Sequence, residues 1–136
     1  MRHLLGALLQ HDLPAVVDME AGLEHLSRGT ERHADVVLVV LEPYYKALET
    51  GRRIAELAGE LGIARVAAVA NKLRDDEDRA AIRDFAARHG LAIEAELPYD
   101  EELRRAERGA TPLVPLERSP ALREVARLAD RLFGAA

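Results

Sequence analysis

Cysteine is absent from the 136-residue sequence. Disulfide bonds, thiol nucleophiles and cysteine-ligated zinc or iron–sulfur centres are therefore excluded from these residues. Lysine is scarce as well: of the 19 basic residues only Lys46 and Lys72 are lysines, and neither follows a glycine. The sequence consequently contains no G-x-x-x-x-G-K-[ST] motif, the loop that cradles phosphates in many nucleotide-binding proteins.

A surplus of positive charge and long apolar runs are also missing. The formal net charge is −5. This charge argues against sequence-independent binding of nucleic acid, because such binding needs clustered Lys and Arg. The longest unbroken apolar run, residues 36–41, is far shorter than the roughly 20 residues of a membrane-spanning helix. The short apolar stretch at residues 4–9 lacks a signal-peptide cleavage site. We therefore expect a cytoplasmic protein with no nucleic-acid or membrane partner.

The composition that is present favours one folded domain over residues 1–136. Hydrophobic residues make up 49% and charged residues 32% of the chain, so a core can form beneath a solvated surface. A disordered chain would have fewer apolar residues. The length suits one domain and is too short for two of ordinary size.

Strand-like and helix-like patterns alternate along the chain. The six apolar residues 36–41 indicate a central parallel strand that is covered on both faces. Alternation of this kind favours right-handed crossovers, and we predict a three-layer α/β domain with a mostly parallel sheet and flanking helices. The predicted strands are residues 15–18, 36–41, 65–70 and 91–97. The predicted helices are residues 2–11, 46–61, 76–89, 100–108 and 119–133, and residues 20–33 are a loop.

The carboxyl ends of the predicted strands are where a ligand site is expected in such a sheet. Asp18 ends the first strand, and a strand-end carboxylate can hold the magnesium ion that bridges nucleotide phosphates. Gly22, four residues later, lets its backbone N–H approach a phosphate closely. A strand-end Asp is also common as a turn or helix-cap residue, and that alternative stays open. The other strand ends carry Glu42-Pro43, Asn71-Lys72 and Pro98-Tyr99-Asp100.

Three stretches of the chain resemble a known family. Residues 16–43 read VVDMEAGLEHLSRGTERHADVVLVVLEP, and later stretches read AVANKL and LPYDEELRRAERGATPL. These stretches resemble the MinD/ParA-type P-loop ATPases, and within them the CooC-type accessory proteins that mature nickel carbon monoxide dehydrogenase. The resemblance covers roughly residues 2–115 and implies the C-terminal half of a P-loop (SIMIBI-class) fold.

The resemblance also implies roles for particular residues. Asp18 would orient a magnesium ion through its water shell, and the Gly22 amide would contact the γ-phosphate of ATP. Asn71 would read the adenine through its side-chain amide, while Pro98 and Tyr99 would border the base. ATP and Mg²⁺ are the implied cofactors. The implied partners are carbon monoxide dehydrogenase or a similar client, with homodimerisation, in a metallochaperone role that inserts nickel.

Two features of that family are missing from these 136 residues: the P-loop and a metal-bridging Cys-x-Cys pair. The resemblance therefore implies a truncated ATPase, and we expect the isolated chain to be inactive because the P-loop supplies most of the phosphate binding. One alternative is a non-catalytic interaction module that pairs with a separate P-loop-bearing chain. Another is a MinD/ParA-like ATPase with a different client.

Other polar residues are better explained without a ligand. His3 and His11, like His25 and His33, are eight residues apart, which does not preform a metal site. We therefore expect no tight nickel or zinc binding. The acidic run at residues 75–78 begins a predicted helix, where carboxylates complement the positive end of the helix dipole. Tyr44-Tyr45 is expected to pack at a strand exit.

The missing P-loop strand leads to a prediction about the sheet. In the resembling ATPases that strand lies between the counterparts of residues 15–18 and 36–41. Unpaired buried backbone groups cost on the order of 1–3 kcal/mol each. We therefore predict that these two strands pair directly in parallel and bring Asp18 close to Glu42. The alternative is a strand inserted by another chain.

Overall fold

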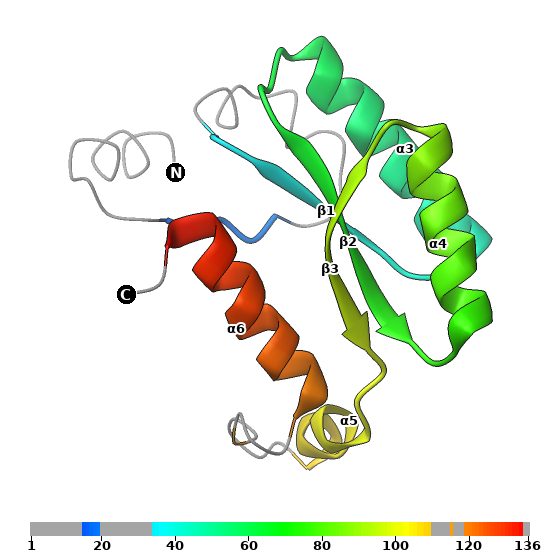
Figure 1. Cartoon of the computed structure of the whole chain (residues 1–136), viewed down its shortest axis with the longest axis vertical. Helices are drawn as coiled ribbons and strands as arrows, with labels where there is room; N and C mark the ends of the chain where they lie inside the picture. The colour runs from blue at the N-terminus through cyan, green and yellow to red at the C-terminus, as the bar shows by residue number, and fades with distance from the viewer. Residues whose placement is uncertain (1–14, 20–33, 110–114, 116–118, 135–136) are drawn as a thin grey trace.

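The computed structural model describes residues 15–19, 34–109, 115 and 119–134 of the chain. These residues form an α/β unit in which strands and helices alternate (Figure 1). Its elements in chain order are β1 (Val37–Leu41), α3 (Tyr45–Glu60), β2 (Val66–Leu73), α4 (Asp76–Arg88), β3 (Ala92–Pro98), α5 (Glu101–Arg108) and α6 (Pro120–Phe133). The predicted elements from residue 36 onward are thereby confirmed, with boundary shifts of a few residues. The predicted helix at 2–11 and loop at 20–33 lie outside the described residues.

The sheet is parallel, in the order β1-β2-β3. Val39 of β1 lies opposite Ala68 of β2, and Ala68 lies opposite Ile93 of β3. Helix α3 connects β1 to β2, and α4 connects β2 to β3. This confirms the predicted parallel sheet, since parallel neighbours need a crossover element between them.

Helices cover both faces of the sheet, which gives the predicted three layers (Figure 1). Successive side chains of a strand point to opposite faces. The face toward α3 and α4 carries the larger core cluster, formed by Val39, Leu41, Ala68, Ala70, Leu73, Ile82 and Phe85. The opposite face packs Val69 and Ala95 against Leu128 of α6. Among the described helices, none is long and apolar enough to cross a membrane.

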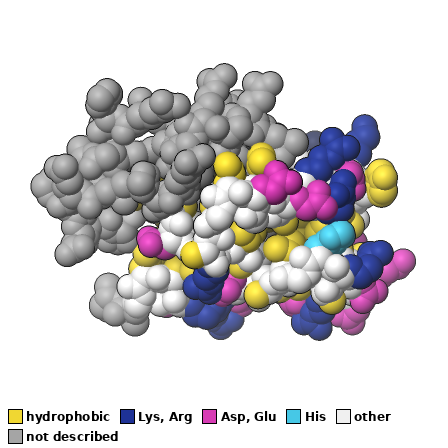
Figure 2. Space-filling model, turned by 90° about the horizontal axis from the view of Figure 1, so that it is seen from above, with side chains coloured by type: hydrophobic (Ala, Val, Ile, Leu, Met, Phe, Trp, Pro, Cys, Tyr) yellow, Lys and Arg dark blue, Asp and Glu magenta, His cyan; other side chains and the backbone are white. Residues whose placement is uncertain are grey.

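Charged side chains of both signs are interspersed on the face seen in Figure 2. Across the described residues, many charged side chains form ion pairs: Arg52 with Glu49 and Glu56 within α3, Arg65 with Glu94, and both Arg79 and Arg83 with Glu96. Most of these pairs are at least partly exposed, and such pairs contribute about 0–1 kcal/mol each. They solvate the surface, and the apolar clusters provide most of the stability.

Helix ends follow the local sequence signals. The Asp75 side chain caps α4 by accepting a hydrogen bond from the Asp78 N–H at 2.8 Å. Three further carboxylates occupy the first turn of α4, so the helix-dipole interpretation of the acidic run is confirmed. Gly62 and Gly90, just after α3 and α4, have φ of 74° and 65°. This left-handed conformation suits glycine, which lacks a Cβ.

Two predictions about the sheet are wrong. Residues 15–19 form no strand, and Val16 and Val17 are 83% and 48% exposed, so residues 15–18 do not pair with β1. A stretch of three apolar residues gains too little burial to form a strand unless a neighbouring strand satisfies its backbone. In addition, β1 lies at the edge of the described sheet, and its Val40 is 58% exposed. The central strand is β2, whose small alanines allow helices to pack closely on the sheet.

Gly51 provides a test of the packing between α3 and β1. Gly51 is buried, and a Cβ built there would overlap the Cδ2 methyl of Leu41, which is fully buried. We expect Gly51→Ala to lower the free energy of unfolding by about 1–3 kcal/mol, because an overpacked core must shift. Gly59→Ala in the same helix is the matched control, since nothing lies within 4 Å of a Cβ there.

The control should gain up to about 1 kcal/mol, because alanine is the better helix former. Urea unfolding of both variants, followed by circular dichroism, measures the difference. Equal gains in stability for the two variants would contradict the close packing of Leu41 on Gly51.

Candidate functional site

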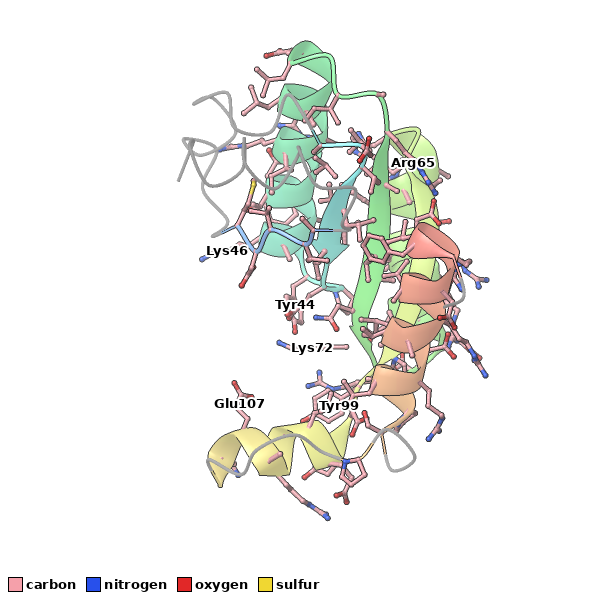
Figure 3. The ribbon with its side chains drawn as sticks, turned by 90° about the vertical axis from the view of Figure 1, so that its left-hand side faces the viewer. Tyr44, Lys46, Arg65, Lys72, Tyr99 and Glu107 are labelled. Carbon is pink, nitrogen blue, oxygen red and sulfur yellow. The ribbon has the colours of Figure 1, made fainter. Side chains whose placement is uncertain are left out.

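The carboxyl ends of the three strands bring polar and aromatic side chains together. Tyr44 follows β1, Lys72 lies near the end of β2, and Tyr99 follows β3. Figure 3 shows these three side chains at the same end of the sheet, with Glu107 of α5 facing the same region. Ligands of open parallel sheets bind at this end, beyond the carboxyl ends of the strands.

The end of β2 is irregular. The register between β2 and β3 shifts between Ala70 and Leu73, and Lys72 has a φ of 58°. A residue with a Cβ pays roughly 1–2 kcal/mol for this left-handed conformation. Non-glycine residues in it are uncommon and often lie at functional sites. Lys72 reaches β1 from this position, and its Nζ donates to Glu42 Oε1 at 2.7 Å.

The Glu42–Lys72 pair is charged at neutral pH. Burial by itself would raise the pKa of Glu42, but hydrogen bonds from Lys72 and Tyr44 and the positive charges of Lys72 and Arg74 outweigh it and lower the pKa. The hydrogen bond to Glu42 raises the pKa of Lys72 and also that of the Tyr44 hydroxyl. The pair therefore fixes the ends of β1 and β2 relative to each other.

The end of β3 is fixed to the end of β2 in a similar way. The Tyr99 N–H donates to the Leu73 carbonyl at 2.8 Å. The Arg74 guanidinium lies over the Tyr99 ring, with its Cζ 4.6 Å from the ring centroid. The Arg74 N–H in turn donates to Asp78 Oδ2 at 2.9 Å. A stacked cation and aromatic ring therefore stand directly beside the predicted site residues of β2 and β3.

Asp100 organises the helices that follow β3. Its side chain is buried and accepts hydrogen bonds from the N–H groups of Glu102 and Leu103 at the start of α5. Its other oxygen accepts from Ser119 Oγ at 2.6 Å and from the Ala121 N–H at 3.3 Å, at the start of α6. Burial would raise the pKa of Asp100, but these hydrogen bonds outweigh it and lower the pKa. One carboxylate thus joins two helix starts.

The predicted site residues divide into two groups. Asn71 in β2, Pro98 at the end of β3 and Tyr99 after it lie at the same edge of the sheet, and all three are half-buried. Asp18 is exposed and ends no strand, contrary to the strand-end position predicted for it. Gly22 lies outside the described residues. The structure therefore brings the residues assigned to the base to the same end of the sheet. Of the two residues assigned to the phosphates, it describes only Asp18, which does not end a strand.

Some features of this edge were missed by the sequence analysis. Arg74 was not singled out, although an arginine three residues after a strand-end Asn is a visible signal. The capping role of Asp100 could have been recognised from the Asp that precedes Glu101-Glu102, but its bond to Ser119 could not. Tyr44 and Tyr45 were expected to pack, yet they are 47% and 81% exposed, so that expectation is wrong.

No group of three or more His, Asp or Glu side chains is arranged to hold a metal ion in the part of the chain that the structure describes. The two histidine pairs of the sequence analysis lie outside that part. His89, which the structure does describe, contacts Phe85 in a tilted arrangement, with ring centroids 4.5 Å apart and an angle of 46° between the rings.

Comparison with solved structures identifies the fold. The MinD cell division protein of Aquifex aeolicus shares the fold with a TM-score of 0.65 over 80% of this chain and 49% of its own, at 21% identity. A chain of the MinC:MinD cell division protein complex of the same organism matches with the same TM-score of 0.65 and 21% identity, over 80% of this chain and 48% of its own. The domain therefore has a MinD-like α/β fold. No model of a protein family matches the sequence.

Several curated proteins are similar to this chain in sequence. The carbon monoxide dehydrogenase accessory protein CooC of Rhodospirillum rubrum is 35% identical over 128 residues, which are 90% of this chain and 47% of CooC. An uncharacterized ATP-binding protein of Methanocaldococcus jannaschii is 39% identical over 108 residues, 79% of this chain and 40% of its own length. A second one from that organism is 32% identical over 98% of this chain and 53% of its own length.

These similarities confirm the resemblance found in the sequence. The chain is similar in sequence to CooC and to two ATP-binding proteins, and it shares its fold with MinD. It spans about half the length of the curated relatives that it matches.

Proposed function

We propose that this chain forms the base-binding side of the ATP site in a CooC-type ATPase that assists nickel insertion into carbon monoxide dehydrogenase. The observation that carries the proposal is the 35% identity to the CooC accessory protein over 90% of the chain. Two other relatives are named ATP-binding proteins, which supports ATP as the ligand of the proposed site. The client is carried over from CooC alone.

The arrangement of the described residues supports the adenine end of this site. Asn71 offers a side-chain amide, which can both donate to and accept from the edge of a base. Pro98 pairs with Leu73, two residues after Asn71, and the Tyr99 N–H donates to the Leu73 carbonyl. In the proposal Asn71 reads the adenine, and the Pro98-Tyr99 segment borders it.

For the phosphate end of the ATP site, the proposed residues are Asp18 and Gly22. Mg²⁺ usually keeps several waters and takes one or two carboxylates together with substrate phosphates. An exposed carboxylate such as Asp18 fits that demand. In the proposal Asp18 holds the water shell of Mg²⁺, and the Gly22 N–H donates to the γ-phosphate. Homodimerisation and a cytoplasmic location belong to the same proposal.

A chimera tests this function. The part of R. rubrum CooC that the chain does not match would be fused ahead of the chain, so that the P-loop is supplied. We expect the folded chimera to bind ATP, to hydrolyse it, and to restore nickel-dependent carbon monoxide dehydrogenase activity in cells that lack CooC. Asn71→Ala should weaken ATP binding by about tenfold, as expected when a base-reading side chain is removed.

The outcomes separate the finer and coarser parts of the proposal. A folded chimera that hydrolyses ATP but does not restore the dehydrogenase would favour a MinD-like ATPase with a different client. A folded chimera that does not bind ATP would contradict the proposed ATP site. The matched control is Asp84→Ala, on the exposed surface of α4, which should behave like the parent chimera.

A second candidate function is an interaction module that pairs with a separate P-loop-bearing chain. It is favoured by the outer edge of β1, which pairs with no strand among the described residues, and by the exposed Val40 on that strand. Supplying the CooC part as a separate polypeptide tests this candidate. Co-purification of the two polypeptides, lost in a Val40→Lys variant, would support it.

A further inference from the structure

Arg74 differs from most arginines of this domain. Eight other arginines form ion pairs with carboxylates: Arg52, Arg53, Arg65, Arg79, Arg83, Arg104, Arg105 and Arg127. The described residues place no carboxylate within ion-pair distance of Arg74. Its guanidinium lies instead on the ring of Tyr99, and the residue is exposed to solvent.

The stack is anchored from both sides. The backbone N–H of Arg74 is held by Asp78, the residue that also closes the cap of α4. The backbone N–H of Tyr99 is held by the Leu73 carbonyl, and Pro98 restricts the chain just before the ring. Both side chains therefore extend from backbone positions that hydrogen bonds hold in place, and the Tyr99 ring contacts the Arg74 guanidinium.

A supported guanidinium is suited to binding a flat π system. Guanidinium planes stack on aromatic rings and on nucleobases, and one plane has two faces. Tyr99 covers one face of Arg74. Arg74 itself is exposed to solvent and directly follows Leu73, the last residue of β2, three residues after Asn71.

We propose that Arg74 is a specificity-determining residue that stacks on the nucleobase, with the Tyr99 ring as the platform on which its guanidinium lies. The inference rests on the proposed nucleotide site and deepens it. A purine has a larger π face than a pyrimidine, so this stack favours purines. Because the contact involves the base alone, the preference does not depend on phosphates or on Mg²⁺.

The test is a titration of the ¹⁵N-labelled 136-residue chain with adenosine and with cytidine, followed by amide chemical shifts. We expect adenosine to shift the amides of Asn71, Arg74 and Tyr99 and to bind more tightly than cytidine. Arg74→Ala should weaken adenosine binding by about tenfold, in line with the loss of one stacking contact. Arg74→Lys should weaken it equally, because lysine keeps the charge and lacks the plane.

Three controls separate stacking from folding. Tyr99→Leu removes the ring and should lose affinity for adenosine as Arg74→Ala does. Arg88→Ala, at the opposite end of α4, should change nothing. Amide spectra of each variant without ligand report whether the fold is retained, and Arg74→Lys is not expected to disturb it.

The test distinguishes a failure of the Arg74 stacking role from a failure of the proposed nucleotide site. If adenosine shifts the Asn71 and Tyr99 amides, and both Arg74 variants bind within about twofold of the parent chain, the stacking role is overturned while the nucleotide site stands; stacking on one base is worth more than such a change. If neither adenosine nor ATP shifts these amides, the proposed base site and the role of Arg74 are both overturned.

Discussion

The 136-residue chain by itself is expected to bind Mg²⁺–ATP with a Kd weaker than about 1 mM, which corresponds to at most about 4 kcal/mol. The reason is the lack of a P-loop in these residues. That loop supplies the backbone N–H groups and the lysine that surround the β- and γ-phosphates. The residues that the structure brings together, Asn71, Pro98 and Tyr99, belong to the base end of the proposed site.

Isothermal titration calorimetry of the purified chain with ATP and with adenosine measures this directly. Because the phosphates gain few contacts, the two ligands should differ by less than about threefold in Kd, or about 0.7 kcal/mol. The chimera with the CooC part is the control, and it should bind ATP at least about 100-fold more tightly than the chain, a difference of about 2.7 kcal/mol. Micromolar ATP affinity for the 136-residue chain would contradict the prediction.

Asp100→Ala is expected to lower the free energy of unfolding by about 2–4 kcal/mol. The substitution removes the cap of α5 and leaves Ser119 Oγ and the Ala121 N–H without their acceptor. Ser119 is fully buried, so water cannot easily replace the lost partner. Asp130→Ala, on the exposed face of α6, is the matched control and should change stability by less than about 0.5 kcal/mol.

Urea unfolding at neutral pH measures both variants. Ser119→Ala should recover part of the loss when it is combined with Asp100→Ala, because the double variant no longer buries an unpaired hydroxyl. Additive losses in the double variant would contradict a direct Asp100–Ser119 bond. A loss for Asp130→Ala as large as that for Asp100→Ala would contradict the special role of the buried carboxylate.

The pH dependence of this loss follows from the lowered pKa of Asp100. Since the folded-state pKa lies below the ordinary value of 3.8, the stabilisation is fully present above the unfolded-state pKa. It disappears as the pH falls through the folded-state pKa. The difference between the parent chain and Asp100→Ala should therefore be constant above about pH 5 and shrink in more acidic solution.

Local sequence patterns determined most of the fold from residue 36 onward. The apolar run of β1 and the apolar spacing of α3 each identify their element without knowledge of any other element. Gly62, Gly90 and Asp75 mark helix ends because the conformations and caps that they provide are local. The strand-end positions of Asn71 and Pro98 followed from the same local patterns, together with the rule that sites lie at the carboxyl ends of parallel strands.

Residues 15–18 and β1 show where local patterns were insufficient. An apolar stretch is compatible with a strand, but it becomes one only when a neighbouring backbone accepts its hydrogen bonds. The sequence indicated that residues 36–41 are apolar, and it could not indicate how many neighbours they would have. The position of β1 at the edge of the described sheet, and the exposure of Val40 and Val17, are properties of pairing between distant segments.

Tertiary structure alone decided the contacts that give the candidate site its shape. Arg74 meets Tyr99 25 residues further along, and Asp100 meets Ser119 19 residues further along. Lys72 reaches Glu42 across 30 residues. From their residue types alone, each of these side chains could pair with several others in the sequence. The register of β2 against its neighbours and the left-handed conformation of Lys72 determine which pairs form, because they set the direction in which each side chain leaves the sheet.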